Sequence, residues 1–104
     1  MSDKIKIDFM SKEFTQSEYD WANISVDDER VGKARCLIEP DRFIIYSINI
    51  FPEYEGFGYG KQFVEYCKEK YDVLLAHNVR FTAVGFWDKM GFKDNQDGHW
   101  IYRK

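Results

Sequence analysis

Residues 48–61 read Ile48-Asn-Ile-Phe-Pro-Glu-Tyr-Glu-Gly-Phe-Gly-Tyr-Gly-Lys61 and place three glycines between an apolar run and an amphipathic run. Glycine permits sharp backbone turns and lets a ligand approach closely. Free N–H groups and the positive end of the dipole make the start of a helix suitable for anions. The stretch therefore predicts either a loop that holds a phosphate or pyrophosphate, with Lys61 adding charge, or a glycine-rich turn without a ligand.

Two well-known phosphate loops are excluded by spacing. A P-loop needs Gly five residues before the Gly of its Gly-Lys pair and Ser or Thr after the Lys, where this chain has Glu55 and Gln62. The dinucleotide fingerprint G-x-G-x-x-G needs Gly at Lys61 or at Phe63. Any ligand of this loop must be recognised in another way.

The elements on either side follow from hydrophobic periodicity. Alternation predicts strands over Lys4–Phe9 (Ile5, Ile7 and Phe9 inward), Trp21–Val26 and Val31–Ile38 (Ala34, Cys36 and Ile38 on one face). Phe43–Phe51 is apolar on both faces, as in a strand in the middle of a covered sheet, Val73–His77 is a short apolar strand, and a last strand is expected over His99–Arg103. Helical spacing predicts Tyr59–Asp72 and Val79–Met90, the second capped by Asn78, and turns are expected at 27–29, 39–42 and 94–98. Four strands in hairpins, then helix, strand, helix and strand, define an α+β class: a mostly antiparallel twisted sheet with helices packed on it.

Composition limits the kind of protein. The chain has 104 residues, 15 basic and 18 acidic, with a net charge of −3, and we expect one domain over 1–104. A nucleic-acid partner would call for a basic excess. The start lacks the apolar region of a signal peptide, and the longest apolar stretch is too short to span a bilayer. We expect a cytoplasmic protein without a membrane or nucleic-acid partner.

Cysteines and histidines give no sign of a metal site. Cys36 and Cys67 are expected to be buried thiols in a reducing compartment. These residues, His77 and His99 are scattered along the chain without the spacing of metal ligands, so no metal is expected.

Two segments together resemble the GNAT superfamily of N-acetyltransferases. Glu55-Gly-Phe-Gly-Tyr-Gly60 is similar to the family's acyl-CoA-binding pattern Gln/Arg-x-x-Gly-x-Gly/Ala, with its first residue changed. After one helix and one strand, Ala83-Val-Gly-Phe-Trp-Asp-Lys-Met-Gly-Phe92 resembles Ala-x-x-Phe-Tyr-x-Lys-x-Gly-Phe. The resemblance covers Ile48 to Phe92.

The resemblance implies an acetyl-CoA cosubstrate and a place for it. In this family, pantetheine lies where the strand before the loop splays from its neighbour, here Phe43–Phe51 from Val73–His77. Backbone groups of Ile48 and Ile50 would pair with the pantetheine amides, and an N–H near Ile50 could polarise the thioester carbonyl. Cofactor-binding residues of the loop would be Gly56, Phe57, Gly58, Tyr59, Gly60 and Lys61. A carboxylate at Glu55 should weaken this binding unless it turns outward.

Two residues are candidates for catalysis. His77 ends the strand beside the expected thioester and is the best candidate for the general base; the alternative is a satisfied histidine at a strand end. Trp87 stands where the family has the Tyr that protonates the leaving thiolate. Indole has no useful acidity, so Trp87 is also interpreted as a core or pocket-wall aromatic.

The resemblance implies an N-acetyltransferase in which an amine attacks acetyl-CoA directly. The alternative is a catalytically degenerate GNAT-fold protein that acts as a CoA-binding or protein-interaction module. Family members are nearer about 150 residues, so we expect a short minimal member with a reduced helical segment between the first two strands, Thr15–Asp20 being its remnant. The reduction predicts an open acceptor side, suited to a protein side chain or completed by a second subunit in a homodimer.

Overall fold

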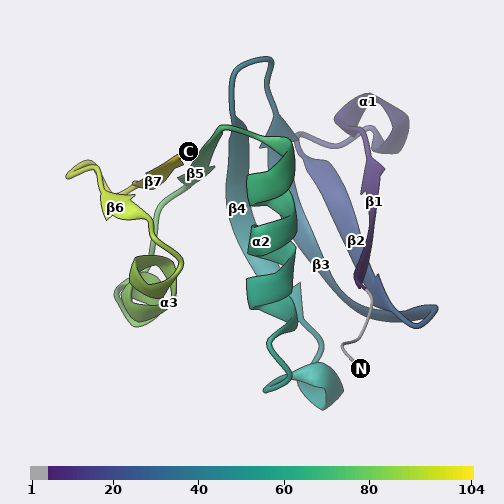
Figure 1. Cartoon of the computed structure of the whole chain (residues 1–104). Coiled ribbons are helices and arrows are strands. Elements are labelled where there is room, and N and C mark those ends of the chain that lie inside the picture. Colours follow the sequence, from purple (N-terminus) through teal and green to yellow (C-terminus); the bar gives the residue numbers. More distant parts are fainter. Residues whose placement is uncertain (1–4) are drawn as a thin grey trace.

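The computed structural model describes residues 5–104, so the predicted start of the first strand at Lys4 lies outside the described residues. One seven-stranded sheet has the order β1-β2-β3-β4-β5-β7-β6, and only the β4–β5 pair is parallel (Figure 1). The predicted α+β class with a mostly antiparallel sheet is confirmed. The strands are β1 (Ile5–Met10), β2 (Asp20–Val26), β3 (Glu29–Ile38), β4 (Phe43–Ile50), β5 (Val73–Ala76), β6 (Lys93–Asp94) and β7 (Trp100–Arg103). The helices are α1 (Lys12–Thr15), α2 (Tyr59–Lys70) and α3 (Val84–Lys89), with 3-10 turns at Pro52–Tyr54 and Phe81–Ala83.

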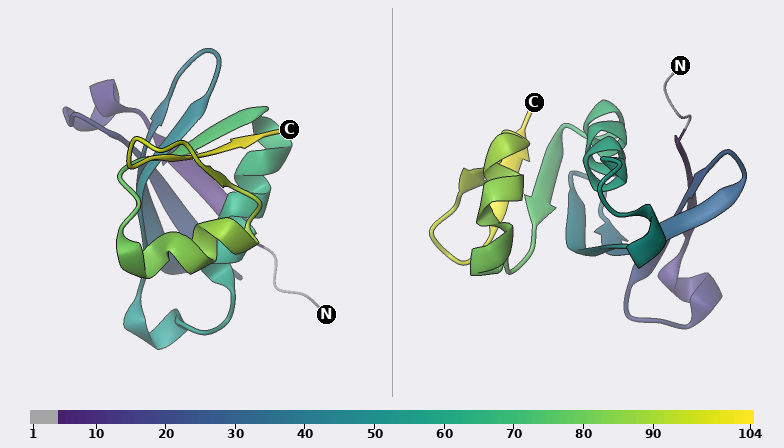
Figure 2. Two further views of the ribbon diagram at one scale, coloured as in Figure 1. Left: turned by 90° about the vertical axis from the view of Figure 1, so that its left-hand side faces the viewer. Right: turned by 90° about the horizontal axis from the view of Figure 1, so that it is seen from below.

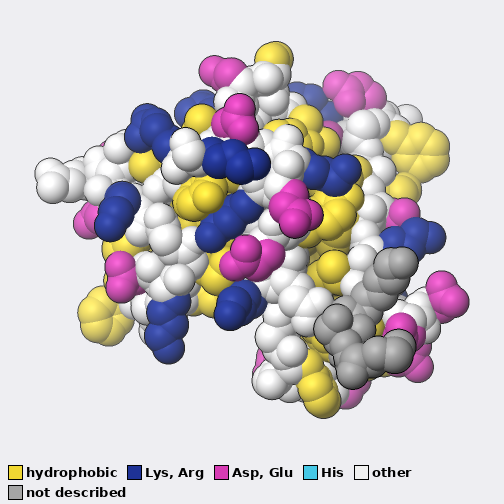
Figure 3. Space-filling view, viewed as in Figure 1, with side chains coloured by type: hydrophobic (Ala, Val, Ile, Leu, Met, Phe, Trp, Pro, Cys, Tyr) yellow, Lys and Arg dark blue, Asp and Glu magenta, His cyan; other side chains and the backbone are white. Residues whose placement is uncertain are grey.

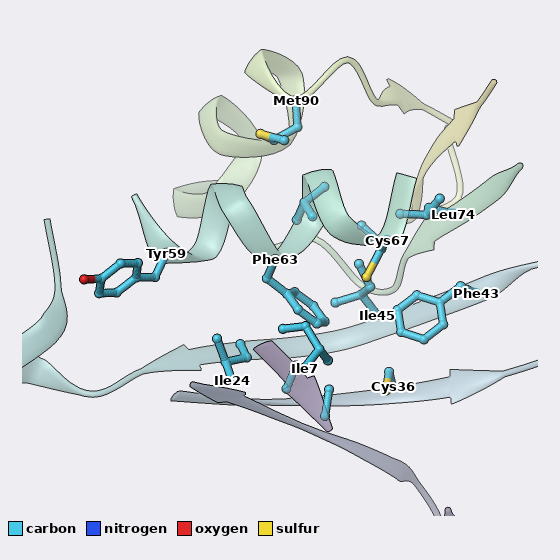
Figure 4. Close-up of a cluster of buried hydrophobic side chains, with 14 of the residues drawn as sticks. Ile7, Ile24, Cys36, Phe43, Ile45, Tyr59, Phe63, Cys67, Leu74 and Met90 are labelled. Atoms are coloured by element: carbon cyan, nitrogen blue, oxygen red, sulfur yellow. The ribbon is translucent and has the colours of Figure 1, made fainter. Parts of the chain in front are cut away.

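The core lies between α2 and one face of the sheet (Figure 4). The helix contributes Phe63, Val64 and Cys67, all 0 % exposed, which are spaced at i, i+1 and i+4 on one stripe. The sheet contributes alternate residues such as Ile24 and Phe43. This packing fixes which face of β3 and β4 is turned away from α2.

The segment between β1 and β2 is short, as expected, but its helix lies elsewhere. Within the described residues 11–19 there is only the four-residue α1, at Lys12–Thr15 rather than within Thr15–Asp20. Ser11 sets its start, because the Ser11 hydroxyl accepts a hydrogen bond from the Phe14 N–H. In the left view of Figure 2, α1 lies on the side of the sheet opposite α2. The helical segment between the first two strands is thus a single turn.

The predicted bounds of the second long helix and its cap are wrong, and two further predictions hold only in part. The helix predicted over Val79–Met90 begins only at Val84, and Asn78 does not cap it: its φ is +48°, and its N–H is bonded to His99 Nδ1. The predicted turn is present at 95–98, but its first predicted residue, Asp94, belongs to the unpredicted strand β6 and pairs with Trp100. Ile38 lies on the same face of β3 as Cys36, as predicted, because it pairs with the core residue Phe43, but it is 42 % exposed at the end of the strand.

Both cysteines are free and buried, which confirms that they are core thiols. Burial raises the pKa of Cys36 to about 12 and raises the pKa of Cys67 as well. Neither is a candidate nucleophile. Among residues 5–104, no helix has the length and apolar character to cross a membrane, and no three His, Cys, Asp or Glu side chains are grouped as a metal site would require.

Candidate functional site

A fork between β4 and β5 forms the centre of the site. The two strands pair only from Phe43 opposite Leu74 to Ile45 opposite Ala76. On the other side of β4, Cys36 pairs with Ile45 but Arg35 pairs with Ser47, so Tyr46 is one extra residue in β4. Such a bulge bends its strand. The bend occurs where β5 ends, and it directs the rest of β4 away from its parallel neighbour.

Beyond the fork, β4 presents backbone groups to the gap. The Phe51 N–H is bonded to the Val31 carbonyl, which makes this a hydrogen-bonded pair of the β3–β4 ladder. In an antiparallel ladder the pairs alternate, so the N–H and C=O of Ile48 and Ile50 point away from β3. No strand of the described chain pairs with β4 on that side after Ile45. An extended ligand could hydrogen-bond there like an added strand.

A cleft of about 490 Å³ occupies the fork. It is lined from both faces of the sheet, since Ile48, Ile50 and Ala76 lie on the α2 side whereas Arg35 and Ser47 lie on the other. Its complete lining is Arg35, Ile45, Tyr46, Ser47, Ile48, Ile50, Gly60, Ala76, His77, Asn78, Val79, Arg80, Ala83, Phe86 and Trp87. The cleft therefore connects the two sides of the sheet.

The glycine loop leads from β4 to α2. Gly56 and Gly58 have φ values of +87° and +81°, and a Cβ at either would meet nothing within 4 Å. Gly58 stands at the N-cap of α2 without a capping side chain. The amides of the first turn, at Gly60 and Lys61, have no partner within the helix. The backbone is thus shaped and oriented to hold an anion.

The predicted loop residues divide between two hollows. Gly60 lines the fork cleft, whereas Phe57, Gly58 and Lys61 line a neighbouring open groove of about 550 Å³ along α2. Tyr59 is 8 % exposed and its ring stacks on Phe57 with centroids 5.7 Å apart. Gly56 and Tyr59 line neither hollow. Glu55 is exposed and also lies outside both.

His77 lies at the closed end of the fork, where its N–H is bonded to the Ile45 carbonyl. Its half-buried ring lies 4.6 Å from Tyr46 and 4.4 Å from His99, between centroids. Burial, and then repulsion from His99, lower the pKa of His77. The imidazole is therefore neutral at neutral pH and able to accept a proton.

Trp87 lines the cleft from the side of α3, opposite β4. It is 8 % exposed and its ring packs against Phe86 and Phe92, with centroids 5.0 and 4.8 Å apart. This environment supports the interpretation of Trp87 as a wall of the cleft that is continuous with the core.

Sequence reasoning missed Arg35, Tyr46 and Arg80 among the lining residues. Tyr46 could not be assigned to a face, because its strand is apolar on both faces and the bulge at Tyr46 appears only in the pairing with β3. Arg35 reaches the fork only through the register of β3 on β4, which no local pattern reveals. Arg80 lies in the segment that was predicted as helix.

A β4–β5 fork beside a glycine loop at a helix start is the arrangement of a CoA-dependent acetyltransferase fold. The sequence profile described as acetyltransferase (GNAT) domain matches residues 18–94, which is most of the chain. This protein belongs to the GNAT acetyltransferase domain family.

Relatives and solved structures agree with this assignment. An uncharacterized N-acetyltransferase of Bacillus pumilus is 36 % identical over 53 residues, covering 51 % of this chain and 33 % of that protein. YlbP of Bacillus subtilis, also described as an uncharacterized N-acetyltransferase, is 32 % identical over 53 residues, covering 51 % and 32 %. The matched part is thus about a third of these relatives.

The fold extends further than the sequence match. The crystal structure of YlbP in complex with coenzyme A superposes with a TM-score of 0.69 at 16 % identity, covering 99 % of this chain and 97 % of that one. A GNAT family acetyltransferase of Elizabethkingia anophelis with acetyl-CoA bound gives 0.71 at 15 % identity, covering 99 % and 100 %.

Proposed function

We propose that this protein is an N-acetyltransferase that transfers the acetyl group of acetyl-CoA to an amine. The observation that carries the proposal is the continuity of the fork cleft with the glycine loop: Gly60 and the free edge of β4 at Ile48 and Ile50 line one cavity that ends at His77. The coenzyme A and acetyl-CoA complexes of the structural neighbours support this choice of cosubstrate.

Each part of the site has a role in the proposed binding. The amides at the start of α2, with Gly58, hold the pyrophosphate, and Lys61 adds a positive charge. The backbone of Ile48 and Ile50 pairs with the pantetheine amides. Because Ile48 lies nearer than Ile50 to the closed end of the fork, we assign the thioester carbonyl to the Ile48 N–H instead of the N–H near Ile50 that the resemblance implied.

In the proposed reaction the amine nitrogen bonds to the thioester carbonyl carbon, and the carbon–sulfur bond breaks. His77 takes the first proton from the acceptor ammonium, which makes the nitrogen nucleophilic. The nitrogen loses its second proton as the amide forms, and this proton replaces the one that the departing thiolate takes, so that the products are the amide and the CoA thiol. Burial raises the pKa of Tyr46, which lines the cleft beside His77, so its hydroxyl stays protonated and can donate to that thiolate.

Titration with acetyl-CoA tests the proposal. At a concentration of 100 times the dissociation constant, binding should raise the free energy of unfolding by about 2.7 kcal/mol. An upward shift of the melting temperature and release of CoA thiol with an amine present are the expected results. Absence of stabilisation at large excess would contradict CoA binding, and binding without turnover of any amine would indicate a CoA-binding module instead.

The pH dependence of turnover tests His77 as the base. The base acts in its neutral form, and the pKa of His77 is lowered from 6.5, so kcat/KM should fall only when the pH drops below 6.5. Replacing His99 by Gln removes the repulsion and should move this acid-side inflection upward, toward 6.5. His77→Gln should abolish the inflection. An unchanged acid limb in His77→Gln would assign the titration to another group.

A further inference from the structure

Arg35 faces the side of the fork opposite α2. It lies in β3 between Ala34 and Cys36, which are 1 % and 0 % exposed and belong to the core under α2. Successive side chains of a strand alternate between faces, so Arg35 projects to the other face. There it lines the fork cleft next to its β4 partner Ser47.

The guanidinium is fixed in place without an acidic partner. Its Nε–H donates to the Ser47 hydroxyl at 3.2 Å, and its Cζ lies 5.0 Å from the centre of the Tyr19 ring. Within residues 5–104 the ion pair found is Arg42 with Glu39, and Arg35 has none. These contacts leave the two terminal nitrogens as donors for a ligand. A planar guanidinium with this freedom suits a carboxylate, which it can bind with two parallel hydrogen bonds.

The charge of the cleft agrees with an anionic group on the ligand. Arg35 and Arg80 line it, and no Asp or Glu of the described chain does. By contrast, the face over α2 mixes basic and acidic side chains (Figure 3), and the chain carries a net charge of −3. A polycationic acceptor would find no counter-charge in this cleft.

Arg35 and the proposed base lie along one row of rings. From Tyr19, under the guanidinium, the row continues to Tyr46 and His77, with centroid separations of 4.9 and 4.6 Å. A ligand lying on this row could place an anion at Arg35 and an amine toward His77. On this side of the sheet, the described segment between β1 and β2 contributes Tyr19 and the one-turn α1 but no helix longer than this.

We infer that Arg35 binds a carboxylate of the acetyl acceptor, so that the substrate class is a small amine that also carries a carboxylate. This inference rests on the proposed acetyltransferase function. The position of Arg35 separates this anion from those of CoA: Arg35 is paired at the closed end of the fork, and the glycine loop follows the other end of β4.

Matched substrates test the inference without any change to the protein. L-phenylalanine, γ-aminobutyrate and 6-aminohexanoate are each compared with their methyl esters at saturating acetyl-CoA, with release of the CoA thiol as readout. The loss of a charge-assisted bidentate contact corresponds to a decrease of about 10- to 100-fold, so at least one free acid should exceed its ester by that factor in kcat/KM. The inference is overturned if every ester equals or exceeds its acid in kcat/KM. It is also overturned if the protein binds acetyl-CoA but no acid is acetylated or raises its melting temperature.

Variants assign the effect to Arg35. Arg35→Gln should remove the preference for the acid, keep kcat/KM for the ester within about threefold of the wild type and leave the KM for acetyl-CoA unchanged. Arg35→Lys keeps the charge but loses the planar guanidinium, so it should retain part of the preference. Lys33→Gln is the control: Lys33 lies on the same strand and face, over the Trp21 ring, outside the cleft, and should keep the preference. Equal loss for acid and ester, or a raised KM for acetyl-CoA, would overturn the assignment. If acetyl-CoA itself does not bind to the wild type, the proposed function fails first and separately.

Discussion

Replacing Gly58 by aspartate is expected to raise the dissociation constant for acetyl-CoA at least about 100-fold while the protein stays folded. Two like charges about 4 Å apart at a protein surface repel by about 4 kcal/mol, and each 1.4 kcal/mol is a factor of ten in affinity. The Cβ at Gly58 would meet no atom within 4 Å, and aspartate tolerates the left-handed conformation that φ = +81° requires. The loss should therefore come from charge at the proposed pyrophosphate site and not from unfolding.

Calorimetric titration and thermal melting separate these contributions. Gly58→Asn is the matched control, since asparagine has the shape of aspartate and its tolerance of positive φ but carries no charge. It should bind acetyl-CoA within about tenfold of the wild type. Wild-type affinity in Gly58→Asp would contradict the placement of the pyrophosphate at the start of α2. An equal loss of affinity in both variants would indicate that shape and not charge causes it.

The sequence could predict those parts of the fold that depend on local periodicity. Phe63, Val64 and Cys67 share a stripe at helical spacing, and the alternation in β1 places Ile7 inward, so the burial of these residues follows from the chain alone. The glycine loop could be predicted from composition, because glycines clustered between an apolar run and an amphipathic run favour a turn with positive φ, as found at Gly56 and Gly58.

The remaining parts depend on how distant segments pair. The extra residue Tyr46 in β4 exists only relative to Cys36 and Arg35 across the ladder, and it determines where β4 leaves β5. Asn78 resembles a helix cap, but tertiary contact prevails: its N–H bonds to His99, and the Val79 N–H bonds to the Gly98 carbonyl. The cleft wall at Arg35 was missed for the same reason, since register is not a local property.

Gly32 is the glycine whose substitution should cost most in stability. It pairs with Ile50, and a Cβ there would lie 2.5 Å from the Asn49 carbonyl oxygen and 2.9 Å from Ile50 Cδ1. A backbone oxygen cannot rotate away as the end of a side chain can, so Gly32→Ala must push β4 from β3. Overpacking typically costs 1–3 kcal/mol, and we expect about 3 kcal/mol here, which corresponds to about 12 °C or more in melting temperature.

Gly85→Ala is the same substitution at another site, and we expect it to raise the free energy of unfolding instead of lowering it. Gly85 lies in α3, and a Cβ there would meet nothing within 4 Å. Alanine at an exposed helical position should raise the free energy of unfolding by about 0.5–1 kcal/mol. Thermal or urea unfolding measures the stability of both variants.

The two variants should also differ in acetyl-CoA binding. Because Ile50 lines the fork cleft, the folded fraction of Gly32→Ala should bind acetyl-CoA more weakly, whereas Gly85→Ala should bind it with wild-type affinity. Wild-type stability in Gly32→Ala would contradict the close approach of β3 and β4, and weakened stability with unchanged binding would show that the cleft wall does not follow the displacement of β4.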